Sequence, residues 1–296
     1  MLTKLNRILV TGSEGFIGQH LVSSLTSQGY TVFEADKKKG IDLSIKETVD
    51  ALPDVDIVVH LAAYNGTKHF YNYPLDVIRD SVLPTQFLLD RYAGKVKRFV
   101  FSGSCESYAT TVDVFGWSVP TNETVPLSIA DITNPRWSYG GSKILNELQI
   151  TAAHSQLGQE YSILRYHNVY GPGQVDHFIP EFVSRAKQGD FSLNGSTNTR
   201  SFMYIDDAIR ATEQIVFSDV CANKILNVGS SNEHTIKEVA NMILKEMQLD
   251  HQLILKAAPL GSVSRRCPDI RLLEKLLNFK CKISLKEGIR KTLESL

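Results

Sequence analysis

The sequence predicts an α/β protein in which a doubly wound parallel sheet is followed by a smaller, partly interleaved C-terminal lobe. In the first half, short apolar runs alternate with helical segments. A glycine-rich turn joins the first of these runs to the first helix, and the regular alternation ends at Gly171-Pro172-Gly173. Continuous apolar strands separated by helices form parallel sheets that helices cover on both faces.

Five strands and three helices are expected in the first half. The strands are predicted at 7–11, 31–36, 56–63, 98–102 and 161–166, and the helices at 16–25, 75–93 and 138–157. The second half predicts a helix at 178–187, a turn-rich segment at 189–200, a strand that ends near Val228 and a helix at 236–248. We therefore expect a first domain over residues 1–173 and a second lobe over 174–296, with some lobe segments returning to the first sheet.

The composition indicates a globular protein without a strongly charged partner. Apolar residues make up 43% of the 296 residues, and Lys+Arg and Asp+Glu are both 32. The longest basic run is Lys37–Lys39, so we expect no nucleic-acid and no membrane-surface partner. The four cysteines form no C-x-x-C pair, so neither a metal site nor a disulfide framework is predicted. Without a recognisable signal peptide or membrane-spanning run, a reducing, cytoplasmic location is expected.

The stretch V-T-G-S-E-G-F-I-G (10–18) joins the first strand to the first helix. Gly12, Gly15 and Gly18 allow a tight turn, close approach of a pyrophosphate, and close packing of the helix on the strand. The positive end of the helix dipole then faces the phosphates. Asp36 ends the second strand, where a carboxylate can bind the adenosine ribose. Together these features predict a Rossmann domain that binds NAD rather than NADP, a preference that Lys37–Lys39 weaken.

Four further motifs make the chain resemble a known family. In W-S-Y-G-G-S-K (137–143), Tyr139 and Lys143 are four residues apart and share one helix face. This pair and the T-G-x-x-G-x-x-G spacing resemble the short-chain dehydrogenase/reductase superfamily. The other motifs, R-Y-H-N-V-Y-G-P-G (165–173), T-R-S-F-M-Y-I-D-D (199–207) and R-C-P-D-I (266–270), are similar to its extended, NAD-dependent nucleotide-sugar epimerase/dehydratase branch.

The resemblance extends from residue 7 to about residue 293 and implies the site residues. Lys143, together with an oxidised nicotinamide, would lower the pKa of Tyr139, which takes the proton of a sugar hydroxyl, usually at C4, while hydride leaves the same carbon. Ser104 would hold that oxygen. The implied cofactor-binding residues are Gly12, Gly15, Phe16, Ile17, Gly18, Asp36, Asp42, Leu43, Leu61, Ala62, Ala63, Tyr139 and Lys143.

The same resemblance implies that the second lobe binds a nucleoside diphosphate-sugar. Asn168, Arg200 and Arg266 would contact the diphosphate or the sugar, and an arginine fork suits a diphosphate. Each of these residues taken alone fits a surface or inter-lobe ion pair equally well. The family often forms homodimers through the helices at 75–93 and 138–157, so we expect a homodimer.

The stretch S-G-S-C-E-S-Y-A (102–109) bears on the reaction that follows oxidation. Glu106 falls where a 4,6-dehydratase has its base, although a loop carboxylate can also cap backbone or pair with arginine. Cys105 is either a thiol acid or a small buried residue. Nucleotide-sugar decarboxylases share the S-E step, and their R-S-F turn matches residues 200–202, which also resemble 3,5-epimerases. A plain 4-epimerase needs no second base.

Two departures from the family pattern and one non-catalytic alternative remain. An NAD-sensing module without catalysis would usually lack the tyrosine or lysine that this chain keeps. In S-V-L-P-T (81–85), Ser81 and Pro84 replace the family's Asn and Gly. Gly140 and Gly141 cost about 1 kcal/mol each in helix propensity. Close approach of the cofactor or the substrate is one reason for glycine at these positions.

Overall fold

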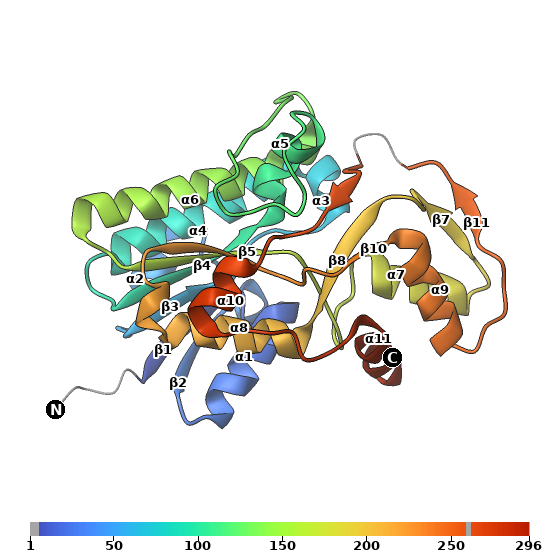
Figure 1. Ribbon diagram of the computed structural model, residues 1–296. Coiled ribbons are helices and arrows are strands. Elements are labelled where there is room, and N and C mark those ends of the chain that lie inside the picture. The colour runs from blue at the N-terminus through green and yellow to red at the C-terminus, as the bar shows by residue number, and fades with distance from the viewer. Residues whose placement is uncertain (1–5, 259–261, 296) are drawn as a thin grey trace.

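The computed structural model describes residues 6–258 and 262–295 and places a six-stranded sheet beside a C-terminal lobe (Figure 1). The strand order is β2-β1-β3-β4-β5-β9, and every neighbouring pair is parallel. The strands are β1 (Arg7–Thr11), β2 (Thr31–Ala35), β3 (Ile57–His60), β4 (Arg98–Ser104), β5 (Tyr161–Tyr166) and β9 (Lys224–Val228). The strand order reverses between β1 and β3, and ligands of doubly wound sheets bind at the carboxyl ends of the strands beside such a point.

Helices cover both faces of this sheet (Figure 1). One face packs against α1 (Phe16–Ser27), α8 (Ile205–Phe217) and α10 (Arg271–Leu277), and the other against α2 (Lys46–Asp50), α4 (Pro74–Tyr92) and α6 (Ser138–Leu157). Alternate residues of each strand enter different cores, because side chains of a strand point to opposite faces. In β1, Ile8 and Val10 join the core of α1 and α8, while Leu9 joins that of α4 and α6.

The C-terminal lobe is built around β8, which pairs with three other short strands. Its elements are β6 (Asn168–Tyr170), α7 (Phe178–Lys187), β7 (Ser192–Asn194), β8 (Thr199–Tyr204), β10 (Glu233–Thr235), α9 (Ile236–Glu246), β11 (Ile254–Lys256), β12 (Arg265–Arg266) and α11 (Leu285–Glu294). The short connecting elements are η1 (Lys37–Lys39), α3 (Thr67–Asn72), η2 (Cys105–Tyr108), α5 (Ala109–Asp113), η3 (Pro135–Trp137) and η4 (Asp219–Cys221). β9 leaves the lobe and pairs with β5 in the main sheet.

The predicted strands and helices are all present, some with shifted ends, whereas β7 lies within the segment predicted to be turn-rich and α8 was not predicted. β3 is shorter than predicted and ends at His60, because β1, its pairing partner, ends at Thr11, the residue opposite His60. β4 is longer than predicted, because its pairing with β5 continues through Ser104, which lies opposite Tyr166. Ser104 is therefore the last strand residue, and η2 starts directly after it.

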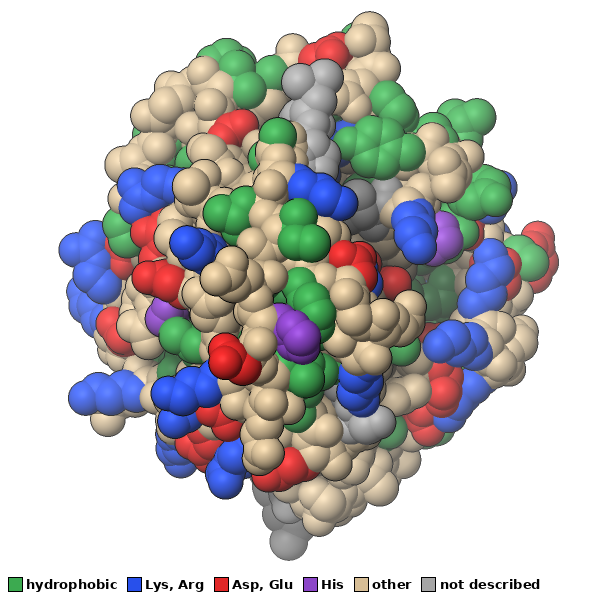
Figure 2. All heavy atoms as spheres, turned by 90° about the vertical axis from the view of Figure 1, so that its right-hand side faces the viewer, with side chains coloured by type: hydrophobic (Ala, Val, Ile, Leu, Met, Phe, Trp, Pro, Cys, Tyr) green, Lys and Arg blue, Asp and Glu red, His purple; other side chains and the backbone are tan. Residues whose placement is uncertain are grey.

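Basic and acidic side chains are interspersed on the face formed by the C-terminal lobe (Figure 2). This mixture accords with the formal net charge of zero. Within residues 6–258 and 262–295, no helix combines the length and apolar character needed to cross a membrane.

A buried ion pair ties α6 to the sheet. Arg165 of β5 donates from Nε to Oε1 of Glu147 at 3.0 Å and from Nη2 to Oε2 at 2.8 Å. Both side chains are at most 5% exposed. Because neither charge reaches water, each depends on the other for its stability in the folded state.

We predict that Arg165→Met lowers the free energy of unfolding by about 3–5 kcal/mol, because it leaves the Glu147 carboxylate buried without its partner. Urea unfolding measures this change. Lys46→Met is the matched control, since Lys46 and Asp50 form a half-exposed pair on α2 and the loss of such a pair should hardly change the free energy of unfolding. Equal losses in the two variants would contradict the prediction.

Candidate active site

The glycine-rich turn between β1 and α1 closes against the loop after β3. Gly12 has φ +69°, and a Cβ there would lie 2.8 Å from the backbone nitrogen of Ala62. A Cβ on Gly18 would overlap the carbonyl of Gly12. Gly15 precedes the first turn of α1 as its N-cap. Neighbouring backbone therefore excludes a side chain at Gly12 and at Gly18, and the absence of these side chains leaves the N-terminus of α1 open to a phosphate.

Asp36 follows β2 and is held by the backbone on both sides. Its carboxylate accepts hydrogen bonds from the N–H of Glu14 at 3.0 Å and from the N–H of Lys38 at 2.8 Å. These bonds fix the carboxylate beside the glycine turn, where an adenosine ribose would lie.

Two side chains of the lysine run next to Asp36 form ion pairs with neighbouring carboxylates. Lys37 forms ion pairs with Asp42 and Asp80 at 3.0 and 3.2 Å, and Lys39 pairs with Glu34 at 2.6 Å. These pairs neutralise two of the charges that a 2′-phosphate would need, so the run does not oppose the choice of NAD that Asp36 indicates.

The remaining predicted cofactor residues gather around the same strand ends. Phe16 and Ile17 begin α1, Leu43 is buried beyond η1, and the N–H of Ala62 donates to the hydroxyl of Thr11 at 3.2 Å. Among the described residues, the buried hydroxyl of Ser13 has no hydrogen-bond partner. A glycine cradle, an unpartnered donor and a fixed carboxylate fit a dinucleotide. Bound NAD would supply the acceptor for a hydride.

Tyr139 and Lys143 lie in the first turns of α6, which brings them to the end of β4. Nζ of Lys143 donates to the carbonyl of Ser102 at 2.6 Å and lies 5.5 Å from the centroid of the Tyr139 ring. Phe70 of α3 also packs on that ring, with 5.1 Å between the two ring centroids. Tyr139 and Ser104 are both 8% exposed.

The protein without NAD does not lower the pKa of Tyr139, and the sequence predicts that effect only for Lys143 together with an oxidised nicotinamide. Burial raises that pKa, the charges of Glu106 and Cys105 raise it further, and a hydrogen bond with Ser104 opposes the rise. Burial also lowers the pKa of Lys143 to about 7. Lys143 is therefore only partly protonated near neutral pH, which weakens its pull on the phenol, and the charge of bound NAD⁺ would add to that pull.

Ser104 and Glu106 are linked through the first turn of η2. The hydroxyl of Ser104 accepts a hydrogen bond from the N–H of Glu106 at 3.2 Å. A Cβ on Gly140 would lie 2.9 Å from the carbonyl oxygen of Glu106, whereas Gly141 has open space around it. Gly140 therefore lets α6 approach the backbone of η2, which brings Tyr139 beside this turn.

Glu106 is a carboxylate between two arginines. Arg266 of β12 places Nη1 3.0 Å from Oε1, and Arg136 of η3 places Nη2 3.6 Å from Oε2. Burial alone would raise the pKa of Glu106, but Arg266, Arg136 and Arg200 outweigh burial and lower it. Glu106 is therefore ionised at neutral pH.

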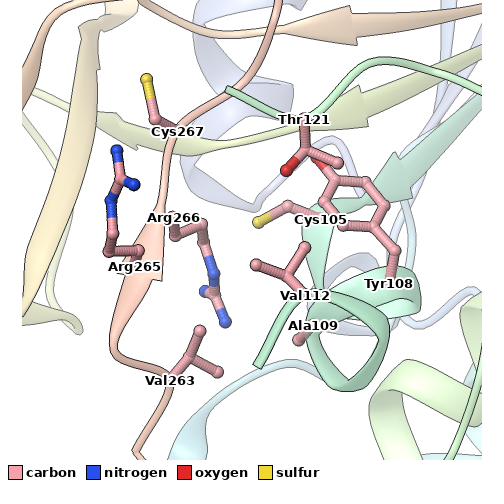
Figure 3. Close-up of a pocket in the computed structure, with 9 residues that line it drawn as sticks. All are labelled: Cys105, Tyr108, Ala109, Val112, Thr121, Val263, Arg265, Arg266 and Cys267. Atoms are coloured by element: carbon pink, nitrogen blue, oxygen red, sulfur yellow. The ribbon is translucent and has the colours of Figure 1, made fainter. Parts of the chain in front are cut away.

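Cys105 and Arg266 face the same narrow pocket (Figure 3). Cys105 is 4% exposed, and burial raises the pKa of its thiol. It is therefore protonated at neutral pH, which fits both a weak acid and a small buried residue. Its role stays a prediction.

The three predicted substrate residues lie on adjoining strands of the lobe. The side-chain amide of Asn168 donates to the carbonyl of Ser201 at 2.8 Å. Arg200 donates to the carbonyls of Thr199 and Val263, and burial lowers its pKa to about 10. Only Arg266 of the three contacts Glu106 directly.

Sequence reasoning missed Arg136 and Phe70. Arg136 is three residues before Tyr139, in the short 3₁₀-helix that ends directly before α6, and its closeness in sequence to Tyr139 is the signal that could have identified it. Phe70 had no such signal, because α3 contacts η3 only through the tertiary fold. Ser81, a departure from the family pattern, is buried in α4, and its carbonyl accepts from Asn146 of α6 at 2.9 Å.

The fold and this site define a nucleotide-sugar enzyme of the NAD-dependent kind. The chain belongs to the NAD dependent epimerase/dehydratase family, whose model matches residues 8–229. It is similar to the UDP-N-acetyl-alpha-D-glucosaminuronate decarboxylase of Bacillus cytotoxicus, with 29% identity over 320 aligned residues that cover 97% of each chain.

Solved structures agree with this assignment. The UDP-glucose 4-epimerase of Thermus thermophilus in complex with NAD is 25% identical, with a TM-score of 0.83 and 98% of each chain covered. MoeE5 in complex with UDP-glucuronic acid and NAD is 26% identical, with a TM-score of 0.82 and the same coverage. The chain is thus an enzyme that uses NAD and acts on a nucleotide-sugar through transient oxidation to a 4-keto sugar, rather than a sensing module.

We predict that Lys143→Met removes a pH-dependent part of the stability of the NAD-free protein. The folded pKa of about 7 lies below the ordinary value of 10.5, so between these values the unfolded chain binds a proton that the folded chain lacks. The free energy of unfolding of the wild type should therefore rise with pH in this window, by at most about 1.4 kcal/mol per unit relative to the variant. Urea unfolding from pH 7 to 10 measures the difference, and a constant difference would contradict the prediction.

Proposed function

We propose that this chain decarboxylates a nucleoside diphosphate-uronic acid through a 4-keto intermediate. The observation that carries this proposal is the ionised Glu106, which lies between Arg266 and Arg136 beside Ser104. Support also comes from the decarboxylase relative, which acts on a UDP-sugar acid, and from MoeE5, which binds one.

The roles of the residues follow from their positions. Tyr139 would take the proton from the C4 hydroxyl, and Ser104 would hold that oxygen through its own hydroxyl. Lys143 is placed to orient Tyr139 from inside α6. Once C4 is a ketone, a carboxylate on C5 belongs to a β-keto acid, whose C5–C6 bond breaks with loss of carbon dioxide.

Glu106 bears on the steps after oxidation. Loss of carbon dioxide leaves an electron pair shared between C5 and the C4 oxygen, and C5 must then take a proton. Glu106 lies at the end of β4, where its charge already acts on Tyr139. An ionised carboxylate there disfavours retention of a second carboxylate, and it would take up a proton from solvent before it delivers one to C5. C4 would then recover its hydride and its proton, which gives the pentose.

A plain 4-epimerase is the second candidate, because the Thermus thermophilus structure belongs to such an enzyme. Epimerisation requires that the ketone turn over and take hydride on its other face, and it gives Glu106 no task. The intact Glu106 therefore favours a reaction with a further step at C5, and the decarboxylase relative and MoeE5 favour decarboxylation as that step.

We predict that incubation with NAD and UDP-glucuronic acid labelled with ¹³C at C6 releases labelled carbon dioxide and yields a UDP-pentose. Trapped carbon dioxide and mass spectrometry of the nucleotide-sugar measure the two products. Tyr139→Phe should lower turnover by at least about 100-fold, the size of a general-base contribution, while NAD stays bound. A UDP-uronic acid epimer that retains the label would establish the 4-epimerase instead.

We also propose that the two parts of the chain bind different ligands. We propose in addition that the protein is located in the reducing cytoplasm. Residues 1–173 would bind NAD, and residues 174–296 would supply most of the nucleotide-sugar contacts, including Arg200 and Arg266. The cytoplasmic location is supported by the four cysteines, which are all free.

We further propose a homodimer formed through α4 and α6. These helices pack side by side (Figure 1) and carry large apolar side chains on their outer surface. Leu75 and Leu148 are 80% and 61% exposed, and Ile78 and Leu145 are also exposed. Burial of such a patch in a second copy would stabilise the pair of chains.

We predict that Leu148→Asp converts the dimer to a monomer, because a carboxylate in the centre of an apolar interface loses its hydration. Sedimentation velocity measures the mass of the particle. Ile254→Asp, which places the same charge on an exposed position of β11, should leave it unchanged. A wild-type monomer would contradict the proposal.

A further inference from the structure

Arg136 is largely buried, but its guanidinium is not fully hydrogen-bonded by the residues around it. Its side chain is only 12% exposed, and its distance of 3.6 Å from Glu106 is longer than a hydrogen bond. Among the described residues, its Nε is a buried atom without a hydrogen-bond partner. A buried guanidinium with unused donors is costly unless an anion completes it.

The backbone around Arg136 holds it in place. The side chain of Asn134 caps η3 by accepting from the N–H of Arg136 at 3.0 Å, and the guanidinium lies 5.0 Å from the centroid of the Trp137 ring. Arg136 lies in η3, which ends directly before α6 and Tyr139, and its guanidinium faces Glu106, the same carboxylate whose charge acts on Tyr139. The unused donors are therefore next to the residue that reacts with C4.

The two neighbouring arginines differ in the groups that they already contact. Arg200 gives two donors to backbone carbonyls of the lobe. Arg266 holds Oε1 of Glu106 and keeps Nε and Nη2 unpartnered, with its side chain 10% exposed. Since Arg266 comes from the lobe and Arg136 from the turn before Tyr139, the two lie on opposite oxygens of Glu106. A sugar that spans this gap would place its diphosphate toward Arg266 and its C4–C6 end toward Arg136.

We propose that Arg136 binds the carboxylate on C5 of the sugar and so selects nucleoside diphosphate-uronic acids over neutral nucleotide-sugars. This inference rests on the proposed function and assigns the selection to one residue. A planar guanidinium can bind a carboxylate with two parallel hydrogen bonds, which a neutral hydroxymethyl group cannot match. The loose contact with Glu106 leaves those donors available.

The test compares dissociation constants in the Tyr139→Phe background, where the full-length protein loaded with NAD binds ligand without turnover. Titration calorimetry measures UDP-glucuronic acid, UDP-glucose and UDP. We expect Arg136→Gln to weaken UDP-glucuronic acid by about 10- to 100-fold, the size of a lost charge-assisted contact, and to leave UDP-glucose and UDP within about twofold. Arg136→Lys should keep part of the preference, because it keeps the charge and loses the fork.

Other outcomes would overturn the assignment in distinguishable ways. Equal weakening of all three ligands would make Arg136 a diphosphate contact, and an unchanged preference for UDP-glucuronic acid would place the selection elsewhere while the proposed function stands. If the background protein with Arg136 intact shows no preference for UDP-glucuronic acid over UDP-glucose, the uronic acid substrate itself is wrong. Arg290→Gln, on the exposed face of α11, controls for loss of a positive charge, and retained NAD content controls for folding.

Discussion

The ion pair between Glu106 and Arg266 is the contact on which the candidate site depends. It joins the turn after β4, in the parallel sheet, to β12, in the C-terminal lobe. Both side chains are largely buried, so the pair forms only when the lobe is seated on the end of the sheet. The same turn positions Ser104 through its cap and meets α6 at Gly140. Residues predicted to act as general base and to bind substrate are thus brought together by one short segment.

The surroundings of this segment carry more positive than negative charge, as the binding of a nucleotide-sugar requires. Three arginines act on a single carboxylate, and their charges lower the pKa of Glu106 in spite of its burial. Such an excess of positive charge destabilises a folded chain unless an anion completes it. The excess charge therefore lowers the free energy of unfolding of the substrate-free protein, and binding of a negatively charged substrate raises it.

The sequence predicted most of the sheet and the chemistry at its edge, because both depend on local patterns. Helix α6 was predicted at its observed bounds, and the turn after β1 follows from glycines that any larger residue would obstruct. Helix α8 was not predicted, since its apolar stripe faces β5 and β9 and follows a segment without regular alternation. Arg136 and Phe70 were missed for a related reason. Their importance comes from contacts with Glu106 and Tyr139, which are distant in sequence and meet only in the fold.

A carboxylate bound by Arg136 would meet two opposing charges during decarboxylation. The guanidinium stabilises the bound substrate, and this alone would slow the reaction, because the carboxylate charge leaves that position as carbon dioxide departs. Glu106, which faces Arg136 from the other side, repels the same charge. The repulsion is greatest in the bound substrate and falls as the electron pair moves to C5 and the C4 oxygen. Binding by an arginine that is already shared with Glu106 therefore secures the substrate without making its carboxylate too stable to leave.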